Sequence, residues 1–79
     1  MRLDKYLKVS RLIKRRTVAN EACDAGKVLV NDKVARASYD IKVGDVITLT
    51  WGARQLKAEV VTVQETVAKN DAAMLYKIV

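Results

Sequence analysis

The chain has 79 residues and a formal net charge of +6; 51% of its residues are hydrophobic, 30% are charged and none is proline. This length accommodates one domain with a modest core, and the hydrophobic content is typical of a globular chain rather than a disordered one. There is no histidine and a single cysteine, which excludes an internal disulfide framework and the Ser-His or Cys-His pairs of most nucleophilic enzymes. Because no apolar run is long enough for a signal peptide or a spanning helix, we expect a cytoplasmic protein that does not bind membranes.

The positive charge is concentrated at the N-terminal end. Residues 1–16 contain seven basic residues and one acidic residue, whereas residues 17–79 contain eight of each. The first segment therefore carries the whole net charge. Clustered positive charge attracts a polyanion, and the four arginines of the cluster favour phosphate, which a guanidinium binds in a forked geometry. The alternative is a solvated face without a specific partner. The basic residues are Arg2, Lys5, Lys8, Arg11, Lys14, Arg15 and Arg16.

A short helix is predicted over residues 2–9. Three apolar side chains fall at i, i+3 and i+4 and form one buried face; these are Leu3, Tyr6 and Leu7. Asp4 and Lys8 are spaced to form an i, i+4 ion pair. A helix this short is marginal by itself in water, so we expect it to dock on the rest of the domain.

A second helix is predicted over about residues 18–25, after a turn at 10–13. Thr17 is the expected N-cap, and Gly26 is the expected left-handed residue that ends the helix. Cys23 is interpreted as a small core residue, since no histidine accompanies it. Two inward faces fit the spacing: one of Val18, Ala22 and Ala25, the other of Ala19, Ala22 and Cys23.

The remaining sequence predicts an antiparallel sheet. Asn31-Asp32 tolerates the positive φ of a tight hairpin turn, and β-branched runs alternate with turn residues at 43–45 and 52–53. Together with the helix pair, these elements predict one α+β domain in which two N-terminal helices pack on a small sheet. The expected strands are residues 28–30, 33–35, 46–51 and 56–63, followed by a short helix over 72–76 that Asp71 caps.

The helix pair is the candidate binding site, and structured RNA is the ligand that suits it best. The start of the second helix adds unpaired N–H groups beside the basic side chains, and Asn20 is placed to donate to a phosphate or a base edge. The four aromatic residues are too few and too scattered for reading single-stranded bases. Because Glu21 and Asp24 lie on the second helix, it is a poor recognition helix for DNA. The acidic residues stand singly, and we predict neither catalysis nor a metal or cofactor.

Several motifs in order resemble the S4 RNA-binding domain. They are RLDKYL at 2–7, SR at 10–11, RRT at 15–17, AGKVLVND at 25–32 and VGD at 43–45. One departure is Asp32, where the family usually has glycine. The resemblance implies an S4-like (alpha-L) fold in a single domain over residues 1–79. Its motif core would occupy about residues 1–50, and a β extension with a short C-terminal helix would occupy 51–79.

Among stand-alone members of the family, the chain is similar to ribosome quality-control factors of the RqcP type and to a related heat-shock protein. This resemblance implies binding to the large ribosomal subunit, its 23S rRNA and peptidyl-tRNA. It also implies support of C-terminal alanine tailing by a monomer working beside a partner that recruits alanyl-tRNA. Two alternatives stay open: a structural or assembly factor of the ribosome, and an RNA-binding subunit for an rRNA- or tRNA-modifying enzyme. The implied RNA-binding residues are Arg2 and Arg16 first, then Lys5, Arg11, Lys14, Arg15 and Asn20.

Overall fold

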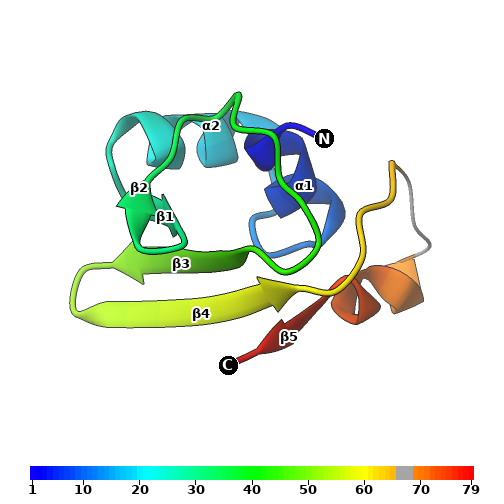
Figure 1. Cartoon of the computed structure of the whole chain (residues 1–79). Helices are drawn as coiled ribbons and strands as arrows, with labels where there is room; N and C mark the ends of the chain where they lie inside the picture. The colour runs from blue at the N-terminus through cyan, green and yellow to red at the C-terminus, as the bar shows by residue number, and fades with distance from the viewer. Residues whose placement is uncertain (66–68) are drawn as a thin grey trace.

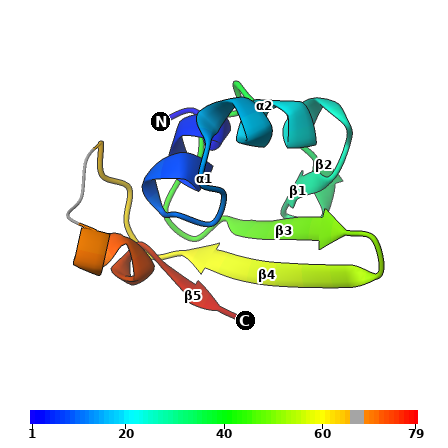
Figure 2. The ribbon, with the colours of Figure 1, turned by 180° about the vertical axis from the view of Figure 1, so that it is seen from behind.

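Two helices lie against one face of a five-stranded antiparallel sheet in the computed structural model, which describes residues 1–65 and 69–79 (Figure 1). The strands follow the spatial order β2-β1-β3-β4-β5. The N-terminus lies beside the helices and the C-terminus lies beyond β4 (Figure 2). This architecture confirms the predicted α+β class. The elements are α1 (Leu3–Val9), α2 (Arg16–Asp24), β1 (Val28–Val30), β2 (Lys33–Val34), β3 (Val46–Trp51), β4 (Arg54–Val60), the 3-10 helix η1 (Lys69–Met74) and β5 (Tyr76–Ile78).

Helix α1 buries the predicted apolar face completely. Its three apolar side chains have no exposed surface; they are Leu3, Tyr6 and Leu7. The predicted ion pair between Asp4 and Lys8 is wrong, because the Asp4 carboxylate points away from solvent and is bonded to other residues. Only 2% of Asp4 is exposed, and a buried carboxylate needs several donors rather than one flexible surface lysine.

Helix α2 begins earlier than predicted. Arg15 occupies the N-cap position without a side-chain cap bond, so the predicted capping by Thr17 is wrong. The reason is that the backbone N–H of Ala19 already bonds the Arg15 carbonyl, which places Thr17 inside the first turn. Among the described residues, no side chain therefore caps the N-terminal end of this helix, and its first N–H groups are left for solvent or a ligand.

The inward face and the end of α2 follow one of the two predicted alternatives. Ala19 and Cys23 are buried, whereas Val18 is about half exposed. The helix ends where Gly26 adopts a φ of +75°. There the N–H groups of Gly26 and Lys27 bond back to the carbonyls of Cys23 and Ala22, both at 3.0 Å, which is the Schellman arrangement of a helix terminus.

Turns of the sheet lie at residues 31–32, 43–44 and 52–53, as predicted. Asn31 and Asp32 both have positive φ, as a two-residue hairpin between β1 and β2 requires. The Asn31 side chain then joins this hairpin to β3, because its Oδ1 accepts from the Val46 N–H at 3.0 Å and its Nδ2 donates to Asp45 at 3.1 Å. Strand β4 begins at Arg54 rather than residue 56, since its pairing with β3 continues to the turn. It ends at Val60 rather than residue 63, because the next two N–H groups bond the Leu75 carbonyl instead. Strand β2 ends at Val34 rather than residue 35.

The C-terminal prediction needs correction. The predicted α-helix over 72–76 is a 3-10 helix over Lys69–Met74, in which Asp71 lies inside the helix instead of capping it. Tyr76 lies in strand β5, which pairs antiparallel with β4. The free edge of β4 offers backbone groups that need partners, and an extended segment satisfies them where a helix would not.

This C-terminal segment is anchored to α1. The buried Tyr6 hydroxyl donates to the Leu75 carbonyl at 2.7 Å, and that carbonyl also accepts from the N–H groups of Val61 and Thr62. Burial raises the pKa of Tyr6 to about 12, with a smaller contribution from Tyr76. The hydroxyl therefore stays protonated as a donor. Within the described ranges, no helix is both long and apolar enough to cross a lipid bilayer.

Candidate nucleic-acid interface

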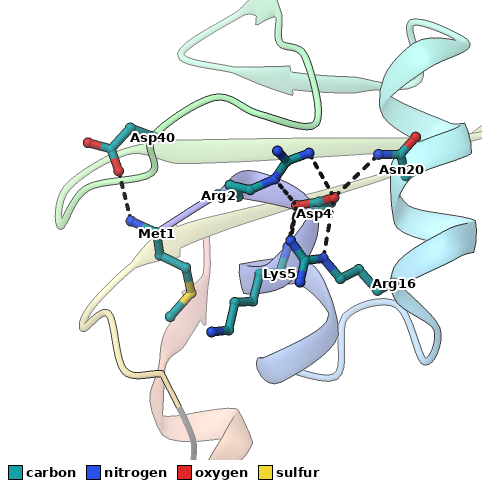
Figure 3. A network of polar contacts seen from close by, with 7 residues as sticks. All are labelled: Met1, Arg2, Asp4, Lys5, Arg16, Asn20 and Asp40. Carbon is teal, nitrogen blue, oxygen red and sulfur yellow. Dashed lines mark hydrogen bonds and ion pairs between the residues drawn. The ribbon is translucent and has the colours of Figure 1, made fainter.

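The predicted RNA-binding residues lie just before α1, on α1 and α2, and on the segment between the two helices. Arg2 precedes α1, Lys5 lies in its first turn, and Arg16 and Asn20 lie in the first half of α2. The structure brings three of the seven together, because the side chains of Arg2, Arg16 and Asn20 converge on one carboxylate, Asp4 (Figure 3). We call these four residues the Asp4 cluster.

The Asp4 carboxylate accepts hydrogen bonds on both oxygens. Arg2 Nε donates to Oδ1 at 3.1 Å and Arg2 Nη2 donates to Oδ2 at 3.4 Å. Arg16 approaches with its Nε 3.4 Å from Oδ2 and its Nη2 3.5 Å from Oδ1. Asn20 Nδ2 donates to Oδ2 at 3.3 Å, and the backbone N–H of Lys5 donates to Oδ1 at 2.8 Å. One buried acid therefore ties the start of α1 to the first turns of α2.

These bonds keep Asp4 ionised. Burial by itself would raise the pKa of a carboxyl group, but the hydrogen bonds from Arg2, Asn20, Arg16 and the Lys5 N–H outweigh it and lower the pKa of Asp4 to about 2. The acid is therefore charged throughout the physiological pH range. Two guanidinium groups and one carboxylate leave the cluster with a net positive charge.

The backbone that carries Arg2 is held in place from the opposite side. Arg2 forms an isolated β-bridge with Asp40. The Met1 amine donates to Asp40 Oδ1 at 2.7 Å (Figure 3). The Ile41 N–H donates to the Met1 carbonyl at 2.8 Å. This amine holds the pKa of Asp40 below its usual value. The segment before α1 is consequently part of the fold, and Arg2 starts from a fixed backbone position.

The side chains of the remaining predicted residues do not bond to Asp4 in the described part of the chain. Lys5 forms an ion pair with Glu65, which follows β4. Arg11, Lys14 and Arg15 are exposed, and the residues that the structure describes supply no ion pair to them. Arg11 also has a φ of 63°, in the left-handed region that disfavours residues with a side chain.

A shallow recess lies beside the Asp4 cluster. It has a volume of about 380 Å³. The outer parts of the two arginines remain accessible, because the side chains of Arg2 and Arg16 are 50% and 47% exposed. The surface thus combines partly exposed guanidinium groups with the uncapped start of α2, which is the chemistry of a phosphate-binding surface. The recess is lined by Asp4, Arg16, Thr17, Asn20 and Glu21.

Asp4 is the site residue that sequence reasoning missed. The pattern assigned it to a surface pair with Lys8, although it is the one acidic residue among the seven basic residues of the segment 1–16. The presence of a single acid in so basic a segment was the sequence signal that could have identified Asp4 as a site residue. Cys23, in contrast, is buried as predicted, and burial raises the pKa of its thiol to about 11, so the thiol is protonated and unreactive at neutral pH.

Comparison with known proteins identifies the family of the chain. The S4 domain family model matches residues 1–47. The RQC P-site tRNA stabilizing factor of Halalkalibacterium halodurans is 49% identical over 78 residues, which cover 99% of this chain and 89% of that protein. The factor of the same name from Bacillus subtilis is 47% identical over 78 residues, covering 99% and 91%. The solved trimeric structure of Vibrio cholerae Heat Shock Protein 15 matches with a TM-score of 0.92 at 29% identity, covering all of this chain and 81% of that one.

Proposed function

Because the chain belongs to the S4 domain family, we propose that it is a ribosome-associated RNA-binding factor of translational quality control. It binds folded RNA by charge and shape and performs no chemistry of its own. Relatives that match nearly the whole chain carry the name RQC P-site tRNA stabilizing factor. Holding a tRNA on a ribosomal particle is a binding role, and a basic face suits it. Its place of action is the cytoplasm, where ribosomes work.

The observation that carries this proposal is the convergence of Arg2, Arg16 and Asn20 around Asp4. These donors come from the residue before α1 and from α2 and lie up to 18 residues apart in the sequence, yet they form one positively charged surface at the uncapped start of α2. Arginine forks and free N–H groups match phosphate oxygens, and RNA helices present arrays of such oxygens. Lys5, Arg11, Lys14 and Arg15 extend the same surface.

In its finer form, the proposal assigns two RNA ligands and one protein partner. The basic face docks on 23S rRNA of an obstructed large subunit and holds a peptidyl-tRNA in place. The protein then supports addition of C-terminal alanine tails to the stalled chain, beside a partner that recruits alanyl-tRNA. We further propose that residues 1–79 form a single domain and that the protein acts as a monomer. Support comes from the relatives' name, which specifies tRNA in the P site, and from the location of the charge.

Co-sedimentation with purified large subunits that carry peptidyl-tRNA tests the proposal. Arg16→Ala and Arg2→Ala are each expected to weaken binding by about 1–3 kcal/mol with the fold intact, as for a charge-assisted contact. Arg54→Ala is the matched control, because it removes the same charge at the exposed first residue of β4 and leaves the helices unchanged. Unchanged binding of both helix variants would overturn the proposal. Equal occupancy of the protein on all translating ribosomes would instead support a structural component.

Salt dependence provides a second measurement on the same particles. If the face binds phosphates, each contact releases a counterion, and the affinity falls steeply as salt rises. About five contacts would lower the affinity by orders of magnitude over a few-fold increase in salt. Arg16→Ala should reduce the slope of log affinity against log salt by about one, whereas a slope unaffected by this substitution would argue against a phosphate contact.

A further inference from the structure

We propose that Asp4 is a positioning residue, which holds the guanidinium groups of Arg2 and Arg16 in a common orientation before RNA arrives. This inference rests on the proposed function and assigns a role to an acid inside a surface built for a polyanion. An acid at that place opposes RNA binding by charge alone. Its presence therefore needs a reason other than attraction of the ligand.

Burial and bonding distinguish Asp4 from an ordinary surface acid. Its side chain is 3% exposed, while the two arginine side chains that it holds are about half exposed. Aspartate is almost never buried unless it is paired, because desolvation of the charge is costly. Here the pairing comes from residues before α1 and within α2, so the carboxylate fixes donors from two separate elements relative to each other.

The geometry leaves part of each guanidinium for a ligand. Arg2 uses its Nε and Nη2 toward Asp4, and Arg16 uses the same two atoms. An arginine has five N–H donors in a fixed planar fork. The Nη1 side of each fork makes no bond to the carboxylate and remains for phosphate oxygens (Figure 3). Asp4 therefore orients the forks without consuming them.

Asp4 favours RNA binding by ordering the side chains of Arg2 and Arg16 in the free protein. A long side chain that becomes fixed on binding loses rotamer freedom, and this loss weakens the complex. If Arg2 and Arg16 are already fixed by Asp4, the loss occurs on folding instead. Removing the carboxylate should then weaken RNA binding about tenfold for two such side chains, although the protein becomes more positive by one charge.

Whether RNA binding weakens or tightens when the Asp4 charge is removed distinguishes a positioning role from a simple effect of charge. Asp4→Asn keeps the size of the side chain and raises the net charge by one. Asp24→Asn makes the same charge change at an exposed acid that ends α2 and lies outside the recess, with no ion pair to break among the described residues. Binding to large subunits carrying peptidyl-tRNA is expected to weaken about tenfold in Asp4→Asn and to stay equal or tighten in Asp24→Asn. Equal or tighter binding by Asp4→Asn would overturn the inference.

A measurement on the free protein tests the positioning role of Asp4 without RNA. Nitrogen-15 relaxation of the arginine Nε–H groups reports how ordered each guanidinium is. Arg2 and Arg16 are expected to be more ordered than the exposed Arg15 in the wild-type protein, and to become as mobile as Arg15 in Asp4→Asn. If Arg2 and Arg16 are as mobile as Arg15 in the wild type, the positioning role is wrong, whether or not Asp4→Asn folds.

The two measurements also keep this inference apart from the proposed function. Failure of the wild-type protein to bind the particle would overturn the proposed function, and the relaxation data would still test the order of the arginines. Circular dichroism and thermal melting of Asp4→Asn show whether weaker binding reflects a lost fold. If that variant does not fold, the comparison of Arg2 and Arg16 with Arg15 in the wild type is decisive.

Discussion

The helix pair and the sheet use charged residues in opposite ways. In the helix pair, the Asp4 carboxylate accepts hydrogen bonds from two arginines and an asparagine, and only 3% of its side chain is exposed. In the sheet, Lys77 and Glu59 lie 3.7 Å apart with 61% and 36% of their side chains exposed, and a pair so exposed adds little to stability. The net charge also lies entirely in the first sixteen residues. The difference indicates that the helices carry the organised polar surface and that the sheet supports it.

The largest expected effect tests whether the basic face depends on the core beneath it. Leu7 is fully buried on α1, so Leu7→Ala should lower the free energy of unfolding by about 3 kcal/mol and abolish RNA binding together with the fold. Val34→Ala, at a position 65% exposed on the edge strand β2, should change stability little. Urea denaturation measures both. If the two variants lose equal free energy of unfolding, the helices do not depend on the core more than the sheet edge does.

The next effect is the pH dependence that Asp4 contributes. Its folded-state pKa of about 2 lies below its ordinary value of 3.8, so its stabilisation is present above pH 3.8 and is lost as the pH falls through 2. The loss is on the order of 2 kcal/mol. Urea denaturation at several pH values should show it in the wild type and not in Asp4→Asn. Parallel pH profiles of the two proteins would show that the buried acid is no more coupled to folding than a surface acid.

A smaller effect measures how firmly the C-terminal segment supports α1. Tyr6→Phe removes the hydroxyl that bonds the Leu75 carbonyl and should lower the free energy of unfolding by about 1 kcal/mol. The loss stays modest because the carbonyl keeps its bonds from Val61 and Thr62. Because Tyr6 does not belong to the Asp4 cluster, RNA affinity of the folded variant should be unchanged. Reduced affinity with a normal melting profile would mean that this anchor also shapes the basic face.

The smallest expected effect concerns Arg11, whose φ of 63° favours glycine. Arg11→Gly should stabilise the fold relative to Arg11→Ala by about 1 kcal/mol, because both variants lose the guanidinium and only glycine relieves the backbone. Both variants should bind the large subunit more weakly than the wild type. Thermal melting and co-sedimentation measure the two properties. Wild-type affinity in both variants would remove Arg11 from the binding surface and leave its unfavourable backbone without a functional reason.

Local patterns predicted much of the fold. The α1 face of Leu3, Tyr6 and Leu7, the Gly26 terminus and the Asn31-Asp32 turn depend on residues within a few positions of one another, and all three are confirmed. The motif series at residues 2–45 also predicted the family, because its members stand in a fixed order along the chain. The concentration of charge in residues 1–16 follows from the sequence directly.

Tertiary structure decided the features whose partners lie far apart in the chain. Sequence spacing favoured Lys8 as the partner of Asp4, an i, i+4 pair worth a few tenths of a kcal/mol. Because Asp4 is buried, its carboxylate needs several donors, and two of them are Arg16 and Asn20, 12 and 16 residues away. Likewise, Tyr76 was expected in a helix, but the unpaired edge of β4 holds it in a strand. In both cases a buried or unpaired polar group must be satisfied, and only the folded chain determines which residues are near enough to do so.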